Sequence, residues 1–325
     1  MKIVTFGGGT GLSNILTGFK KDYGKKIKSL TAVVTVSDSG GSSGILRRIY
    51  DIPAVGDIRN CLLALSNIEN YVKKVMQYRF TEGRGLMGHP LGNLFLVALL
   101  ETEGNILKAV KKASKILNVS GEVMPATFQK TELVAVFEDK STIIGEEEIT
   151  NYGILSKKRI VSLKLRPENP KVPKELIERI NSADILIFGP GSLYTSILPN
   201  VLIKKIKERI DKAKGLKIFI VNLLTQPGET DDFSASDHLK EFLRISGIKK
   251  IDFTILNNGE LTKEQRERMK EEGKSLVMAD VEEIKKLGIK FYLDDLINKK
   301  EIYVKHDPYK LKDLIFKIAK DCGII

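Results

Sequence analysis

Short apolar runs alternate with amphipathic stretches along most of the chain. Runs typical of buried strands fall at residues 3–6, 30–36, 185–188, 218–221 and 253–256. Helical periodicity starts near Leu12 and recurs at about residues 62–65, 91–100, 173–180, 201–210, 237–245 and 262–272. This alternation is typical of parallel strands connected by helices. The sequence therefore predicts an α/β fold, Rossmann-like and doubly wound, with a mostly parallel sheet.

The pattern changes between about residues 121 and 170. Residues 133–137 and 160–165 read as alternating strands separated by polar turns. We therefore expect one Rossmann-like domain over residues 1–325, with a small strand-rich insertion at about 121–170. A helical C-terminal extension is expected at about residues 280–325.

Composition and charge narrow the class of ligand. Hydrophobic residues make up 42% of the 325 positions, which is enough for a packed core. Lys and Arg number 53 against 41 Asp and Glu, and residues 1–100 hold 13 basic and 6 acidic residues. Such an excess attracts anions. The longest basic clusters are short, as at residues 157–159, which favours a small anionic ligand and argues against nucleic acid.

The number of cysteines and the length of the apolar runs indicate the cellular compartment of the protein. Cys61 and Cys322 are too few for a disulfide framework or a thiolate metal site, which fits a reducing environment. The first apolar run meets glycines at residue 7, which leaves no room for a secretory signal core. No apolar stretch approaches the roughly 18 residues of a membrane span. We expect a cytoplasmic protein without a membrane span.

The loop after the first predicted strand is rich in glycine. Open α/β sheets bind ligands beyond the carboxyl ends of their strands. Glycines in such a loop allow a phosphate to approach the amides at the start of the following helix. The candidate phosphate-binding residues are Gly7, Gly8, Gly9, Thr10, Gly11 and Leu12. The loop departs from G-x-G-x-x-G at Leu12 and lacks a P-loop ending, so a tight turn is the alternative.

The loop after the second strand supplies Asp38, Ser39, Ser42 and Ser43. Asp38 is placed to accept hydrogen bonds from ribose hydroxyls. A helix cap and a Mg²⁺ ligand are the alternatives for that carboxylate. The serines suit an anion, and the alternative is an ordinary flexible turn.

Two helix entrances carry further candidates. Asp57, Arg59 and Asn60 precede an apolar run, where Arg59 would clamp a phosphate and Asp57 would hold a metal or cap the helix. His89 lies between glycines before another helix and would act as acid, base or donor, or as a structural hydrogen-bonding group. Asn93 is a candidate ligand contact.

Polar loops also follow two of the later strands. Pro190, Gly191 and Ser192 repeat the glycine-rich pattern and suit a second phosphate, with a tight turn as the alternative. Tyr194 would stack on a ring or pack in the core. Asn222, Thr225 and Gln226 suit sugar hydroxyls or a cation. His238, expected on a surface helix, and His306 receive no role.

Six of these segments together resemble the gluconeogenesis factor family. They are GGGTG at 7–11, VTVSDSGGSSGILR at 34–47, GDIRNCLLAL at 56–65, GHPLGNL at 88–94, GPGSLYTSILPN at 189–200 and TQPGETDDFSASDH at 225–238. The first three also resemble the sister family, the 2-phospho-L-lactate transferases. The resemblance runs in order over residues 1–280.

The resemblance implies a cytoplasmic, Rossmann-like protein that binds UDP-sugars and is linked to gluconeogenic growth, cell shape and cell-wall precursor supply. It places residues 7–11, Asp38, Asp57, Asn60 and residues 190–192 at a nucleotide site. The sister transferases move a phospholactyl group from a guanylyl donor to a deazaflavin with Mg²⁺. Residues 41–44 depart from the His-containing stretch of those transferases, which argues against deazaflavin chemistry.

Three functions follow as hypotheses. The first is a factor that binds a nucleotide or nucleotide-sugar, with or without turnover. The second is a Mg²⁺-dependent transferase of a phospho-group, in which Asp38 or Asp57 holds the metal and Asp57 and His89 are the candidate catalytic residues. The third is an NAD-dependent oxidoreductase, which the fold permits but no hydride-handling residue supports. A homo-oligomer stays open.

Overall fold

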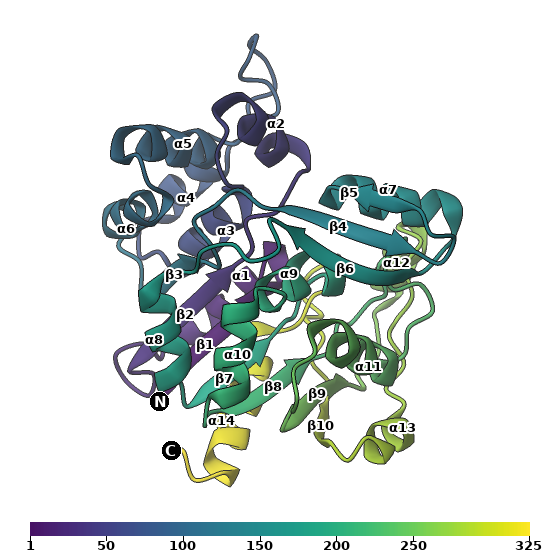
Figure 1. Cartoon of the computed structure of the whole chain (residues 1–325). Coiled ribbons are helices and arrows are strands. Elements are labelled where there is room, and N and C mark those ends of the chain that lie inside the picture. The colour runs from purple at the N-terminus through teal and green to yellow at the C-terminus, as the bar shows by residue number, and fades with distance from the viewer.

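The computed structural model describes residues 1–325, and its main sheet contains seven parallel strands (Figure 1). Their order across the sheet is β10-β9-β8-β7-β1-β2-β3. The strands are β1 (Lys2–Gly7), β2 (Ser29–Val34), β3 (Glu122–Pro125), β7 (Ile185–Phe188), β8 (Leu216–Ile220), β9 (Phe253–Asn257) and β10 (Lys290–Asp294). The predicted doubly wound α/β fold is confirmed.

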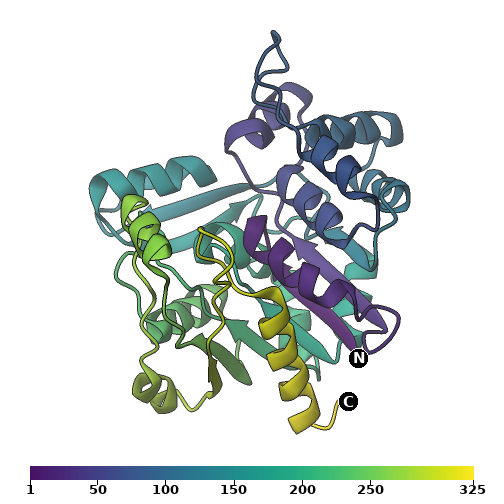
Figure 2. The ribbon, with the colours of Figure 1, turned by 180° about the vertical axis from the view of Figure 1, so that it is seen from behind.

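Helices cover both faces of this sheet. On one face lie α1 (Gly9–Lys20), α3 (Gly56–Leu65) and α14 (Pro308–Asp321), of which α1 and α14 are seen in front of the sheet in Figure 2. On the other face lie α8 (Lys174–Ser182), α10 (Lys204–Lys212) and α11 (Ala235–Ser246), seen in front in Figure 1.

Strand β7 shows how the sequence builds this arrangement. All four of its residues are buried. Ile185 and Ile187 enter the core under α1, α3 and α14, whereas Leu186 and Phe188 enter the core under α8, α10 and α11. A strand covered on both faces needs apolar residues at every position, so it reads as a continuous apolar run.

Further helices surround the sheet. They are α2 (Gly41–Tyr50), α4 (Asn70–Gln77), α5 (Leu91–Glu103), α6 (Ile106–Ile116), α7 (Glu146–Ser156), α9 (Leu198–Val201), α12 (Lys263–Glu271), α13 (Val281–Lys286) and the π-helix η1 (Leu193–Ile197). The segment with α2 to α6 lies between β2 and β3 in the chain. None of the helices combines the length and the apolar character that crossing a bilayer requires.

A small antiparallel sheet lies beside the main one. Its strands are β4 (Glu132–Phe137), β5 (Thr142–Ile144) and β6 (Ile160–Arg166), in the order β5-β4-β6. Alternate residues of β4 are buried, and that face joins the core under α8, α10 and α11. The expected insertion began too early, because residues 122–125 form β3, an edge strand of the main sheet.

Two element boundaries also differ from expectation. Residues 280–325 contain β10 in addition to helices, and β10 was missed because only its three central residues are apolar and none of its residues is buried. Helix α1 begins at Gly9 instead of Leu12, because glycine and threonine carry no apolar periodicity.

The strand order reverses at the centre of the sheet. Strand β1 pairs with β2 on one side and with β7 on the other, with Ile3 opposite both Leu30 and Ile185. The chain after β1 therefore turns to one side, while the chain after β7 continues to the opposite side. A crevice forms at such a reversal, beyond the carboxyl ends of the strands.

Candidate functional site

The two glycine-rich loops pack against each other at this reversal. A Cβ atom on Gly11 would lie 2.4 Å from the carbonyl oxygen of Pro190, and one on Gly191 would lie 3.6 Å from the carbonyl oxygen of Gly8. Contact at the first of these distances excludes any side chain at position 11 unless the backbone moves. Gly11 therefore allows the β1 and β7 loops to meet.

The start of α1 lies at the same place. Gly8 is the N-cap and supplies no side-chain hydrogen bond, and no acidic residue lies in the first turn. The start of α2 at Gly40 is uncapped in the same way. The amide of Gly9 donates to the carboxylate of Asp57, and the helix dipole together with the other amides of the first turn favours an anion.

A cavity of about 610 Å³, here called the switch-point cavity, opens beside these loops. It brings together several of the predicted residues, namely Thr10, Gly11, Pro190, Gly191, Asn222, Thr225 and Gln226. More than half of its lining residues carry polar or charged side chains. Parts of the chain more than 200 residues apart, from α1 to the C-terminal segment, meet here.

Asn222 holds the second glycine loop in place. Its Oδ1 accepts a hydrogen bond from the amide of Gly191 at 3.0 Å, and its Nδ2 donates to the carbonyl of Gly191 at 2.7 Å. Ser192 donates to Glu229 Oε2 at 2.5 Å and faces that buried carboxylate. Burial raises the pKa of Glu229. Because of its two hydrogen bonds to Gly191, the side chain of Asn222 shapes the loop as well as lining the cavity.

The cavity is also lined by residues to which the sequence analysis gave no role. Asn14, Lys274, Lys305 and His306 line it. His306 is 5% exposed, its Nε2 has no hydrogen-bond partner, and burial lowers its pKa to about 4. The imidazole is therefore neutral near pH 7. The polar, aperiodic segment around it gave no signal of its position.

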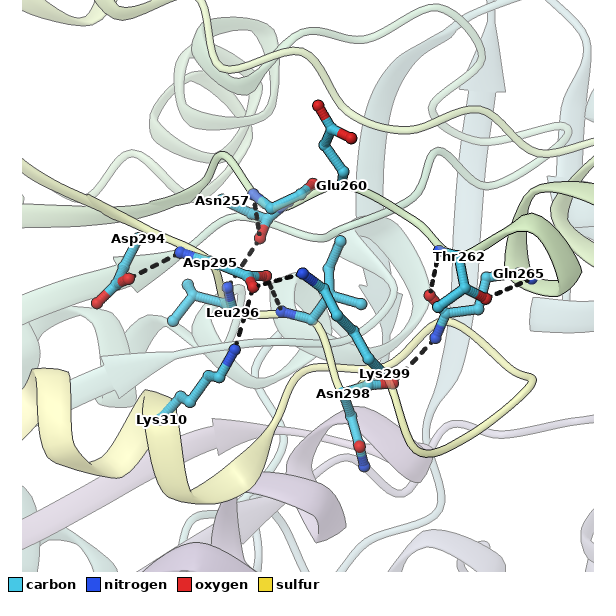
Figure 3. A network of polar contacts seen from close by, with 12 residues as sticks. Asn257, Glu260, Thr262, Gln265, Asp294, Asp295, Leu296, Asn298, Lys299 and Lys310 are labelled. Carbon is cyan, nitrogen blue, oxygen red and sulfur yellow. Dashed lines mark hydrogen bonds and ion pairs between the residues drawn. The ribbon is translucent and has the colours of Figure 1, made fainter.

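A polar network fixes this C-terminal segment (Figure 3). Asp295 accepts hydrogen bonds from Lys299 Nζ at 2.8 Å and Lys310 Nζ at 3.2 Å. Asn257, at the end of β9, accepts the amide of Leu296 at 2.9 Å, and Gln265 donates to the carbonyl of Asn298 at 2.9 Å. The loop that carries Lys305 and His306 is thus tied to the end of the sheet.

Carboxylates gather beside the first glycine loop. A Cβ atom on Gly8 would lie 2.3 Å from Asp57 Oδ2, and one on Gly56 would lie 3.5 Å from Asp38 Oδ2. Burial, and then the charge of Asp38, raise the pKa of Asp57 to about 7. Burial and the charges of Asp38 and Asp57 also raise the pKa of Glu146, whose Oε2 has no hydrogen-bond partner.

The positions of Asp38 and Asp57 raise the question of whether these carboxylates could hold a metal ion. No group of three or more His, Cys, Asp and Glu side chains is arranged to hold a metal ion. Mg²⁺ commonly takes only one or two carboxylates, and phosphate oxygens and water complete its shell. Asp38 and Asp57 are hard oxygen donors, so their chemistry fits such a cation.

Several predicted residues form an interhelical network instead of a cavity wall. Arg59 donates to Asn93 Oδ1 at 2.9 Å and to Asn60 Oδ1 at 2.7 Å. Asn93 donates to Ser42 Oγ at 3.0 Å, and Ser42 Oγ is 2.8 Å from His89 Nδ1. His89 and Asn93 are buried within this network and do not line the switch-point cavity. They connect α2, α3 and α5.

Other predicted residues also lie away from the cavity. Tyr194 is 1% exposed and donates to Glu241 at 2.7 Å, so it packs in the core and presents no face for stacking. Leu12 is a core residue, and Ser43 is buried. Ser39 donates to Glu148 at 3.1 Å. His238, expected at the surface, is buried and bonds to the carbonyl of Ser234.

Comparison with known proteins now identifies the family. The sequence model described as 2-phospho-L-lactate transferase CofD matches residues 3–297. The chain belongs to the CofD family. The match covers the main sheet, the small sheet and both glycine loops of this CofD-family member.

The CofD-family chain is also similar to proteins named gluconeogenesis factors. The Bacillus subtilis gluconeogenesis factor is 42% identical over 320 residues, covering 98% of each chain. An Aquifex aeolicus protein, provisionally given the same name, is 49% identical over 321 residues, 99% of this chain and 97% of its own. The crystal structure of protein BH3568 from Bacillus halodurans has a TM-score of 0.92 at 38% identity, covering 97% of this chain and 99% of that one.

Proposed function

We propose that this CofD-family protein is a gluconeogenesis factor that binds a nucleotide-sugar of the UDP-sugar type in the switch-point cavity. The observation that carries the proposal is the meeting of two glycine-rich loops at the reversal of strand order, beside a polar cavity of about 610 Å³. Such a position is where open α/β sheets bind nucleotides.

The chemistry of the walls supports a ligand with a diphosphate and a sugar. Amides at the start of α1 would receive the phosphates, and Lys274 and Lys305 would add positive charge. Asn222, Thr225 and Gln226 offer amide and hydroxyl groups suited to sugar hydroxyls. The neutral imidazole of His306 would contact the base or the sugar.

Calorimetric titration tests the proposal with UDP-glucose, UDP-N-acetylglucosamine, UDP, GDP and NAD. We expect the UDP-sugars to bind with a dissociation constant below about 1 mM, and NAD and GDP to bind at least tenfold more weakly. Absence of UDP-sugar binding at that level would refute the proposal. Preferential binding of NAD would favour the oxidoreductase hypothesis instead.

A matched pair of variants locates the site. Asn222→Ala removes both hydrogen bonds to Gly191, each worth on the order of 1 kcal/mol, and should weaken UDP-sugar binding at least tenfold, because the loop is no longer held in place. Asn258→Ala changes an exposed asparagine just after the neighbouring strand β9 and should leave binding unchanged. Equal effects of the two variants would place the ligand elsewhere.

The cellular part of the proposal is a role in gluconeogenic growth, cell shape and cell-wall precursor supply. The relatives named gluconeogenesis factors support the first of these roles, and the other two rest on the resemblance of the six sequence segments alone. The test is expression of this chain in Bacillus subtilis lacking its own gluconeogenesis factor. Restored growth on a gluconeogenic carbon source, and its loss with Asn222→Ala, is the expected result.

A second candidate is a Mg²⁺-dependent transferase of a phospho-group. The pairing of Asp57 with Asp38 beside the amides of α1 favours it. Bound there with the donor, Mg²⁺ would neutralise charge on the phosphate. Turnover of nucleotide-linked donors, abolished in Asp57→Asn, would establish this function, whereas inactivity across a broad donor panel would exclude it. His89 is unsuited to act directly, because it is buried in the interhelical network.

A further inference from the structure

A second hollow, here called the lysine hollow, lies on the other side of α1 from the core. Its volume is about 430 Å³, and four lysines line it, Lys20, Lys21, Lys73 and Lys305. No aspartate or glutamate lies in its wall. Apart from Leu63, Ala64 and Tyr309, the remaining lining residues carry hydroxyl or amide groups.

Helix periodicity explains how these side chains share one surface. Each of residues 10, 13, 14, 17, 20 and 21 of the α1 region lies three or four positions from another member of this set, so they share one face, opposite the buried stripe of Leu12, Ile15, Leu16 and Phe19. Lys73 and Gln77 recur at i, i+4 on α4. Lys305 arrives with the C-terminal segment. A polar stripe is thus enclosed by α4, α3 and that segment.

Three of the four lysines that line this hollow have no carboxylate partner. Lys20, Lys21 and Lys73 have no carboxylate within 4.0 Å, whereas Lys305 is 2.7 Å from Glu301, and Lys274 in the switch-point cavity is 2.7 Å from Glu272. Lys20 donates to the carbonyl of Ser66, and Lys21 lies 5.1 Å from the centre of the Tyr309 ring.

The like charges also act on one another. Partial burial, and then the ammonium of Lys73, lower the pKa of Lys20. Two neighbouring cations disfavour each other's charged form, and an anion between them reverses that effect. The hollow is therefore electrostatically suited to a ligand with at least two negative charges.

We propose that the lysine hollow binds a phosphorylated polyol, a small molecule with a phosphate monoester and several hydroxyl groups, distinct from the ligand of the switch-point cavity. The lysines would receive the phosphate. Ser13, Thr17 and Asn60 would exchange hydrogen bonds with the hydroxyls. Thr10, Asn14 and Lys305 line both cavities, so the two ligands share a wall.

The test is titration of the full chain with glucose 6-phosphate, inorganic phosphate and glucose at fixed ionic strength. We expect glucose 6-phosphate to bind with a dissociation constant below about 1 mM, inorganic phosphate at least tenfold more weakly, and glucose not at all. Equal affinity for inorganic phosphate and glucose 6-phosphate would indicate an adventitious ion only and overturn the proposal. Binding of polyglutamate but not of glucose 6-phosphate would overturn it as well.

Three variants assign the site. Lys73→Gln should weaken glucose 6-phosphate binding at least tenfold, whereas Lys74→Gln, the exposed neighbour on the same helix outside the hollow, should not. Asn222→Ala should leave this binding unchanged. An equal loss in Asn222→Ala would place the sugar phosphate in the switch-point cavity and overturn the proposal. The probe here is glucose 6-phosphate and not a UDP-sugar. The result therefore tests the lysine hollow even where the protein binds no UDP-sugar.

Discussion

At the scale of single residues, the glycines of the two loops matter because they carry no side chain. Gly11 allows the backbone of α1 to touch the carbonyl of Pro190, and Gly8 leaves space that the carboxylate of Asp57 occupies. The sequence indicated glycine loops that bind phosphate. The structure adds that part of this requirement is contact between the loops themselves.

Gly11→Ala tests that contact. The new Cβ atom would lie 2.4 Å from the Pro190 oxygen, so we expect the free energy of unfolding to fall by about 1–3 kcal/mol and UDP-sugar binding to weaken. Urea denaturation and calorimetric titration measure the two effects. Thr10→Ala, an exposed change in the same turn, should alter stability by less than about 0.5 kcal/mol. Equal stability of the two variants would contradict the interpretation.

Asp57 makes a pH-dependent contribution to stability. Its pKa is raised to about 7 in the folded chain, against about 3.9 for a free aspartate, so the folded state binds more protons between these values. The fold therefore carries a penalty from this group at pH 8 that disappears as the pH falls toward 4. Asparagine removes the penalty at every pH.

Asp57→Asn should therefore be more stable than the wild type at pH 8, by about 1–2 kcal/mol, and the difference should shrink at pH 5. The expected difference is below the full value of the shift because the pKa of the Glu146 carboxyl is itself raised in part by the charge of Asp57, so the two groups are coupled. Urea denaturation at both pH values gives the comparison. Asp232→Asn, at an exposed position, should show the same difference from the wild type at both. A constant difference for Asp57→Asn would contradict the assignment.

At the scale of elements, the C-terminal segment completes the switch-point cavity. Residues 295–307 contain no helix or strand, yet Asp295, Gln265 and Asn257 fix the segment at the ends of β9 and β10. Pattern analysis finds elements by periodicity, and a loop held by hydrogen bonds has none. This is why Lys305 and His306 were missed, while β7 and its loop were found.

Asp295→Ala tests the positioning of this segment. Loss of the bonds to Lys299 and Lys310 should increase amide hydrogen exchange in residues 296–307 at least tenfold and weaken UDP-sugar binding, with little change in global stability. Mass-spectrometric exchange and titration measure both. Glu260→Ala removes an exposed carboxylate nearby and should change neither. Normal exchange in Asp295→Ala would contradict the anchoring role.

At the scale of the whole molecule, two cores share one sheet. The small sheet of β4 to β6 packs into the same core as α8, α10 and α11, so it has no separate core of its own. We therefore expect a single cooperative unfolding transition that includes the predicted insertion. Coincident curves from circular dichroism and from a fluorophore attached to β4 would agree, whereas an earlier transition of the fluorophore would identify the small sheet as an independent unit.

The sequence by itself determined the doubly wound sheet, both glycine loops and the family resemblance, because buried strands and loop glycines impose local patterns that are visible in one dimension. Only the tertiary structure decided which polar residues face a cavity. His89, Asn93 and Tyr194 turned inward, while Asn14, Lys305 and His306 reached the ligand-sized space. The physical reason is that a side chain's surroundings depend on segments far away in the chain, and hydrogen-bond partners between such segments leave no periodic trace in either one.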